Sequence, residues 1–350
     1  SQVNVLFGLL PDNNNSGAAQ SSKLMVTGEA TVNLKNALGG GELPDLNRHQ
    51  IHPKSPRLNL ALQLPYLFNS PFGMNAAFDL FKKDSSFINI SFLVGAQYAV
   101  STGNTGSVFI QNTRSNLLTV DTNVVKNEKR LPPEADVSAV NLGVNYEWYN
   151  TDYRFNPRKG TDFFISASAG TRKIRKNSVI VKLKDQGNPE FDYNSLYDTF
   201  QLNSYQFRVK AVASQYFKLT RVSTLKMAFN GGWFQSPDIF RNELFQIGGY
   251  KLLRGFDEES IYASSYAVGT SEYRYLLGQN SFLFAFIDFG WARSDSRNIK
   301  VNNTFLGTGI GMAFETKAGI FNISYAVGKR DDTRFNLRQA KIHLGYVNYF

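Results

Sequence analysis

GGYKLLRGF, at residues 248–256, is the stretch that decides the fold of this chain, and the acidic pair Asp257 and Glu258 follows it directly. The double glycine allows the backbone to reverse with positive φ angles. Arg254 stands among apolar residues that would bury it, and a buried guanidinium requires a carboxylate partner. The sequence therefore predicts that Arg254 meets an acid from elsewhere in the chain.

Two strands are predicted next, at 263–277 and 281–293, and each carries one candidate acid. Glu272 lies on the polar face of the first strand, because strand residues of one parity share a face. Asp288 interrupts a strand in which both parities are apolar. A carboxylate in such surroundings is costly unless a cation or several donors meet it, so we expect Asp288 to pair with Arg254, with Glu272 nearby.

The composition indicates many β-strands. A length of 350 residues suits two soluble domains or one large all-β domain, and no run approaches the ~18 apolar residues of a membrane helix. Aromatic residues make up 14% of the chain, with 28 glycines, which is typical of strands that carry aromatic girdles. The absence of cysteine excludes disulfide frameworks and thiolate metal sites.

The residue types needed for catalysis or nucleic-acid binding are not arranged in a recognisable site. The net charge is +10, but the basic residues are dispersed, which favours contact with anionic lipid headgroups or a cationic lumen over nucleic acid. The three histidines, His49, His52 and His343, form no metal-ligand pattern, and no Gly-x-Ser-x-Gly, P-loop or His-Glu-x-x-His motif occurs. We expect no enzyme activity, no metal and no cofactor.

Segments of about ten residues alternate apolar and polar side chains throughout the chain, and 202–217 shows this most clearly. A soluble β-sandwich also alternates, because one face of each sheet is solvated. The strands here are long, aromatics cluster near their ends, and charged residues occupy the middle of the polar parity. These features favour a barrel with a lipid-facing outside and a wet lumen over a soluble sandwich that binds a ligand.

The alternation predicts about 16 strands, within the even-numbered range of outer-membrane barrels. The strand at 41–50 contains Pro44, and the polar connections 119–134, 174–201 and 234–262 are long, so we expect them on one side of the membrane. The predicted strands are 2–10, 23–36, 41–50, 56–66, 72–82, 86–100, 106–118, 135–150, 160–173, 202–218, 222–235, 263–277, 281–293, 304–316, 319–329 and 339–350.

The order Gly-Gly, Leu-Arg-Gly-Phe, SEYR at 271–274 and FIDFG at 286–290 resembles the carboxyl-terminal barrel of the Omp85 superfamily, which includes BamA, TamA and the two-partner secretion transporters. An isolated Arg-Gly-Phe would more often be a hairpin turn with a surface arginine. The resemblance implies a transmembrane antiparallel barrel with a long extracellular loop, 234–262, folded into the lumen. Glu272 and Asp288 would be the wall acids that pair the loop arginine. The loop motif would comprise Gly248, Gly249, Leu253, Arg254, Gly255 and Phe256.

The same resemblance extends to the turns. NPRKG at 156–160 is similar to the Pro-x-x-Gly turn that the family places on its periplasmic side, and PYLF at 65–68 and FKKDS at 81–85 resemble the BamA/TamA-type proteins of Bacteroidota. Gly307, Gly309 and Gly311 share one strand parity, and we interpret them as the floor on which the inserted loop lies. Close strand packing or barrel curvature is the equally favoured alternative.

The first and last strands would close the barrel. Ile342, Leu344, Tyr346 and the terminal Phe350 share a parity, which resembles the bacterial β-signal with Gly345 at its preferred glycine position. The first strand is short and ends at Pro11, so we expect few ladder hydrogen bonds at this seam. The family resemblance implies a lateral gate here. The gate and β-signal residues would be Val3, Val5, Gly345, Tyr346 and Phe350.

By resemblance, the chain would insert or translocate outer-membrane polypeptides without ATP, in the outer membrane of a Gram-negative bacterium. Its partners would be outer-membrane lipids and unfolded outer-membrane proteins. No POTRA module is predicted within 1–350, so such modules would precede Ser1, or accessory periplasmic or lipoprotein subunits would deliver the substrate. The alternative function is a passive porin-like channel of the same architecture.

Overall fold

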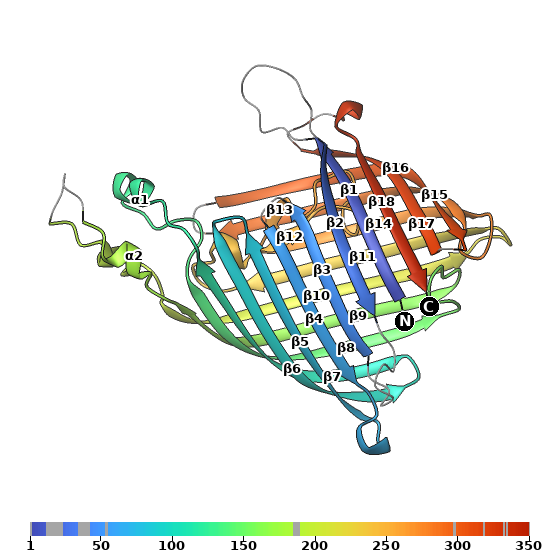
Figure 1. The fold of residues 1–350 in the computed structure, drawn as a ribbon, viewed down its shortest axis with the longest axis horizontal. Helices are drawn as coiled ribbons and strands as arrows, with labels where there is room; N and C mark the ends of the chain where they lie inside the picture. The colour runs from blue at the N-terminus through green and yellow to red at the C-terminus, as the bar shows by residue number, and fades with distance from the viewer. Residues whose placement is uncertain are drawn as a thin grey trace.

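Sixteen antiparallel strands close into a barrel in which β1 pairs with β18 (Figure 1). The computed structural model describes residues 2–11, 24–33, 43–52, 55–184, 190–296, 299–317, 319–331, 333 and 335–349. The barrel strands are β1 (Gln2–Pro11), β2 (Leu24–Asn33), β3 (Leu43–His52), β4 (Ser55–Leu64), β5 (Phe72–Lys83), β6 (Phe87–Ser101), β7 (Asn104–Leu117), β8 (Val137–Thr151), β9 (Gly160–Ile174), β10 (Asn203–Lys218), β11 (Ser223–Gln235), β14 (Ser265–Leu276), β15 (Phe282–Ser296), β16 (Ile299–Thr316), β17 (Gly319–Arg330) and β18 (Lys341–Tyr349).

The remaining elements lie in the connections. Strands β12 (Phe245–Ile247) and β13 (Ile261–Ala263) form a two-stranded sheet within the long loop between β11 and β14. Among the described residues, no helix is long and apolar enough to cross a membrane. The helices are α1 (Thr122–Glu128), α2 (Ser178–Val181), η1 (Leu67–Asn69), η2 (Tyr193–Tyr197), η3 (Arg241–Glu243) and η4 (Leu337–Gln339).

Alternation along each strand separates an apolar outside from a mixed inside. On β8, the side chains of Val140, Leu142 and Val144 are exposed, whereas Asn141 between them is buried. Asn141 accepts a hydrogen bond from Gln206 of β10 at 2.7 Å, so inward polar groups pair with each other across the intervening strand β9. An exposed apolar band around a closed barrel is the surface that a bilayer covers.

The predicted strands are confirmed at all sixteen places, with ends that differ by a few residues. Pro44 of β3 pairs with Leu62 of β4, and among the described residues the ladder between β3 and β2 begins one residue later, at Asp45. A proline without an N–H can stand where one neighbouring ladder has ended.

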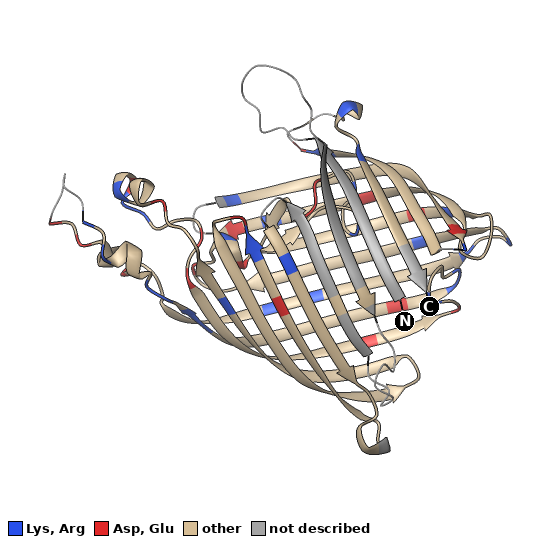
Figure 2. Ribbon diagram, in the orientation of Figure 1, with Lys and Arg blue, Asp and Glu red and all other residues tan. Residues whose placement is uncertain are grey.

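The long connections between β7 and β8, β9 and β10, and β11 and β14 all lie at one end of the barrel. Short turns such as that between β5 and β6 lie at this end too, so the expected strict alternation of long and short connections is wrong. Both termini lie at one end, and α1 and α2 project beyond the other end, as expected for 119–134 and 174–201 (Figure 1). These two connections pack together around a small apolar core that includes Val125, Ile180 and Tyr193. Figure 2 shows that basic and acidic residues are interspersed along strands and loops and do not gather into one stripe.

Candidate functional site in the barrel lumen

The loop between β11 and β14 folds back inside the barrel and reverses at the predicted glycines. Gly248 and Gly249 have φ angles of 109° and 113°, and Gly255 has a φ of 92°. The Gly249 amide donates to the Leu253 carbonyl, and the Leu252 amide donates to the Gly249 carbonyl, both at 3.3 Å. The reversal therefore needs residues without a Cβ at its glycine positions and places Arg254 at the wall.

Arg254 meets two wall carboxylates. Its Nε and Nη2 donate to Asp288 of β15, each at 2.9 Å, and its backbone amide also donates to Asp288 at 2.9 Å. Its Nη1 donates to Glu272 of β14 at 2.5 Å. The guanidinium carbon lies 3.5 Å from the ring centroid of Phe286, within range of a cation–π contact.

The acids are themselves fixed by other donors. The Thr270 hydroxyl donates to Asp288 at 2.8 Å, and Arg274 donates to Glu272 at 2.9 Å. Arg274 also donates to Asn156, which belongs to the connection between β8 and β9. The result is a network of two arginines and two acids that joins the loop tip to the turn at the opposite end of the barrel.

The network is buried, so each of its charged groups needs a partner of opposite charge. The side chains of Arg254, Glu272 and Asp288 are only 10%, 7% and 1% exposed. Burial alone would lower the pKa of Arg254, but its hydrogen bonds to Asp288 and the charge of Glu272 outweigh burial and raise that pKa. Burial also raises the pKa of nearby Tyr250 to about 12, so its phenol stays neutral. The arginine is therefore a permanent cation whose removal would leave buried charge unpaired.

The residues around Arg254 fix the loop tip by shape. Leu253 has a φ of 62° and packs in a buried cluster with Val268 and Phe305. A Cβ at Gly290 of β15 would meet the Leu253 side chain. Phe256 packs edge-on against Phe305, with 5.3 Å between ring centroids.

The glycine floor is smaller than expected. A Cβ at Gly307 would collide with the Arg254 carbonyl oxygen, so this glycine does make room for the loop. Gly309 and Gly311 share the face of Gly307, but a Cβ there would first meet the Phe286 and Phe284 rings and the backbone of β17. At these two positions the alternative, close packing of neighbouring strands, explains the missing side chains. Gly328 of β17, which the sequence reasoning missed, packs against Gly255 and Phe256.

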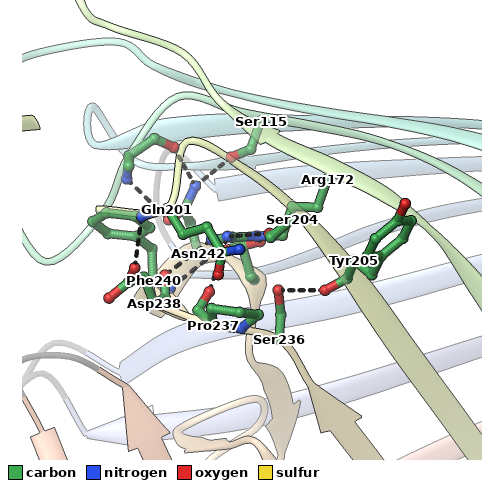
Figure 3. Close-up of polar contacts among 12 residues, drawn as sticks. Ser115, Arg172, Gln201, Ser204, Tyr205, Ser236, Pro237, Asp238, Phe240 and Asn242 are labelled. Carbon is green, nitrogen blue, oxygen red and sulfur yellow. Dashed lines mark hydrogen bonds and ion pairs between the residues drawn. The ribbon is translucent and has the colours of Figure 1, made fainter. Parts of the chain in front are cut away.

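A second anchor, also missed from the sequence, holds the base of the loop (Figure 3). Arg172 of β9 binds Glu243 through two nitrogens, at 2.7 and 2.6 Å, and donates to the carbonyl oxygens of Pro237 and Asp238. Asn242 exchanges hydrogen bonds with the backbone of Ala135. In the sequence, Arg172 occupies the same inward parity as other polar residues of its strand, so only the tertiary structure reveals its partner.

The structure gives the strand partners of most of the predicted seam residues but does not describe all of their side chains. On the strand ladder Val3 is the partner of Asn348, Val5 of Tyr346, and Leu6 of Gly345. The side chains of Val3 and Val5 are not among the described parts of the chain, and Phe350 lies outside the described residues. His343 of β18 faces the loop, with its ring centroid 5.6 Å from that of Tyr250. His49 and His52 both belong to β3.

A cavity of about 950 Å³ remains in the lumen beside the loop. Charged and polar side chains from several walls line it, among them Arg57, Asp79, Lys210, Asn230 and Glu259. A smaller cavity of about 280 Å³ lies on the other side of the loop tip, beside Arg254, Glu272 and Asp288.

The barrel is similar to several solved structures. The chain is similar in structure to BamA from Haemophilus ducreyi lacking POTRA domains 1–3, with a TM-score of 0.63 and 14% identity over 99% of this chain and 69% of that one. It is also similar to CdiB from Acinetobacter baumannii, with a TM-score of 0.61 and 13% identity over 99% of this chain and 59% of that one. CdiB from Escherichia coli gives a TM-score of 0.56 and 12% identity, over 99% and 62% of the two chains.

The chain thus spans 59% to 69% of these three structures. Among curated proteins, none matches the chain. The expected likeness to Bacteroidota proteins stays a prediction. The family model described as the Omp85 superfamily domain matches residues 36–345. Because this match covers most of the barrel, the chain belongs to the Omp85 superfamily.

Proposed function

We propose that this protein inserts polypeptides into the outer membrane of a Gram-negative bacterium or moves them across it. The observation that carries the proposal is the buried Arg254 network, which holds a long loop inside a closed barrel. A loop fixed in the lumen by three hydrogen bonds to one acid partly plugs the barrel, which favours an assembly function over a wide, open pore. A barrel that must stay ordered while its wall opens would gain a fixed internal support.

The wall would open at the seam between β1 and β18. Among the described residues eight pairs are aligned there, compared with fifteen between β8 and β9, eight between β4 and β5 and seven between β17 and β18. Strands separated at this place would expose unpaired N–H and C=O groups, which are a template for a strand of an incoming protein. The free energy for insertion would come from strand pairing and from burial of apolar residues in lipid. Neither nucleotide hydrolysis nor other covalent chemistry is part of the proposal.

The proposed partners follow from the same function. Unfolded outer-membrane proteins would be the substrates, and outer-membrane lipids would contact the apolar band. POTRA modules or accessory periplasmic or lipoprotein subunits would deliver the substrates to the turn end of the barrel. The β-signal proposed for Gly345, Tyr346 and Phe350 would direct assembly of this barrel itself.

A passive porin-like channel is the second candidate, and the lumenal cavity is the observation that favours it. Its volume of about 950 Å³ and its charged lining would accommodate hydrated ions. The two functions differ in what purified protein does in a bilayer. An assembly protein accelerates folding of added substrate and conducts only in brief openings, whereas a porin conducts steadily and does not affect folding.

To test the proposal, the protein is reconstituted into liposomes in which outer-membrane proteins fold only slowly without assistance. An unfolded eight-stranded barrel is added, and its folded fraction is followed by heat-dependent electrophoretic mobility. We expect folding to accelerate by about ten-fold or more relative to liposomes that hold an unrelated porin at equal protein mass. Equal folding rates, together with a steady conductance in planar bilayers, would favour the channel.

A further inference from the structure

The loop tip makes ion pairs on both sides of the barrel seam. Asp257 pairs with Lys341 of β18, with 2.6 Å between Oδ1 and Nζ. Two residues later, Glu259 pairs with Arg57 of β4, with 3.1 Å between Oε1 and Nη1. In the barrel, β1, β2 and β3 lie between β18 and β4. The segment 257–259 therefore bridges, from inside, the whole arc that contains the β1–β18 seam.

The arc under this bridge has short ladders. The described residues give eight aligned pairs between β1 and β18 and six between β2 and β3, compared with eight between β4 and β5 and seven between β17 and β18. A short ladder has few hydrogen bonds to hold neighbouring strands together. An opening at either place would move β4 away from β18 and would pull on the bridge.

On the β18 side the bridge is firmly attached. Arg254 is held by β14 and β15, Gly255 packs on Gly328 of β17, and Tyr250 packs on His343 of β18. Asp257 adds an ion pair to Lys341, whose side chain is 16% exposed. The loop tip thus contacts β14, β15, β17 and β18, which attaches it to this side of the seam at several points.

On the β4 side the attachment is easier to release. Arg57 also donates from Nε to Asp79 of β5 at 3.0 Å, so its charge keeps a carboxylate partner when Glu259 departs. The Arg57 side chain is 39% exposed, similar to the 44% of Asp257 in the other pair, but Arg57 and Glu259 both line the lumenal cavity, where water can replace the lost contact. Ion pairs this accessible contribute about 1 kcal/mol or less. Burial raises the pKa of Glu259, which also makes its charged, paired form less favourable.

We propose that segment 257–259 is an internal clasp across the seam, fixed to β18 and released at Arg57–Glu259 when the arc β1–β4 swings away. The inference rests on the proposed lateral opening and adds the residues that restrain it. Breaking the Arg57–Glu259 contact shifts the barrel toward open states. Making that contact permanent holds the barrel closed, whereas making the Asp257–Lys341 contact permanent changes little because those groups move together.

The chain has no cysteine, so pairs of cysteines can be linked without background. One variant carries Arg57→Cys and Glu259→Cys, and the other carries Asp257→Cys and Lys341→Cys. A reducible bifunctional thiol reagent, long enough to replace an ion pair, links each pair in proteoliposomes. We expect the 57–259 link to slow substrate folding by about ten-fold and reduction to restore it, and the 257–341 link to act less than about two-fold. Equal effects of the two links would overturn the clasp.

A second measurement does not depend on substrate folding. Phe7 of β1 and Leu344 of β18 are aligned across the seam, so a protein with Phe7→Cys and Leu344→Cys forms a disulfide under mild oxidation only while the seam is closed. Adding Glu259→Gln should slow this disulfide formation several-fold. Glu134→Gln, which removes the acid paired with Arg241 of the same loop, is the matched control. Equal rates in the two variants would overturn the clasp, whereas a slower Glu259→Gln rate in a protein that folds no substrate would reject only the proposed function.

Discussion

Arg254 and Asp288 are joined by three hydrogen bonds, one from the backbone amide of Arg254 and two from its guanidinium. The backbone bond fixes where the loop lies, and the two side-chain bonds fix how the guanidinium is oriented. Glu272 accepts from the remaining nitrogen, Nη1, so one planar cation is shared by two strands. A lysine has one charged nitrogen and could not reproduce this geometry.

Replacing Arg254 by alanine should destabilise the folded barrel. The change leaves Asp288 and Glu272 buried without the loop cation, and removing one partner of a buried pair typically costs about 3–5 kcal/mol. The measurement is the urea midpoint of unfolding in detergent micelles. Arg293→Ala is the control, because its pair with Asp295 is exposed at 58% and 38%. Equal midpoints for the two variants would show that the Arg254 network does not stabilise the fold.

A valine at Gly307 should displace the loop tip while leaving the strands paired. Its Cβ would collide with the Arg254 carbonyl oxygen, which cannot move without breaking the bonds to Asp288. The expected result is slower folding of added substrate, by about ten-fold, in barrels that keep their heat-dependent mobility. Gly269→Ala is the matched control, since a Cβ there meets open space. A Gly307→Val protein as active as that control would contradict the contact.

The sequence predicts the barrel more completely than it predicts the loop anchors. Alternation is a local property, so each strand appeared near its true limits, even β3 with Pro44. The sequence also predicts the acids that pair with Arg254, because Asp288 is an exception in an otherwise apolar strand. The Arg172–Glu243 and Arg57–Glu259 pairs join residues 71 and 202 positions apart. Nothing in the local pattern distinguishes Arg172 or Arg57 from other lumenal cations.

Replacing Arg172 by methionine should free the base of the loop. Glu243 would lose its bidentate partner, and the carbonyl oxygens of Pro237 and Asp238 would lose their donor. Trypsin should then cut at Arg241, in the same segment, about ten-fold faster, since proteolysis follows local opening. Lys173→Met is the neighbouring control on the outward face of β9. Cleavage at Arg241 at the control rate would show that other contacts are sufficient to hold the loop base.

Removing the inserted loop should convert the barrel into a steady pore. A short Gly-Ser link that joins β11 directly to β14 removes the tip and the two-stranded sheet β12–β13 from the lumen. Single-channel recordings in planar bilayers should then show a larger and longer-lived conductance than the intact protein. A shortening of the connection between β9 and β10 by a similar length is the control. An intact protein that already conducts as strongly as the loop deletion would support the porin-like function.

The most direct test of the central claim compares substrate folding by wild-type protein and Arg254→Ala in proteoliposomes that contain equal amounts of folded barrel. If the Arg254 network supports an assembly barrel, the wild-type protein accelerates insertion of an unfolded outer-membrane protein, and the variant loses most of that acceleration, about ten-fold. Equal acceleration by the two folded proteins would contradict the role given to the inserted loop.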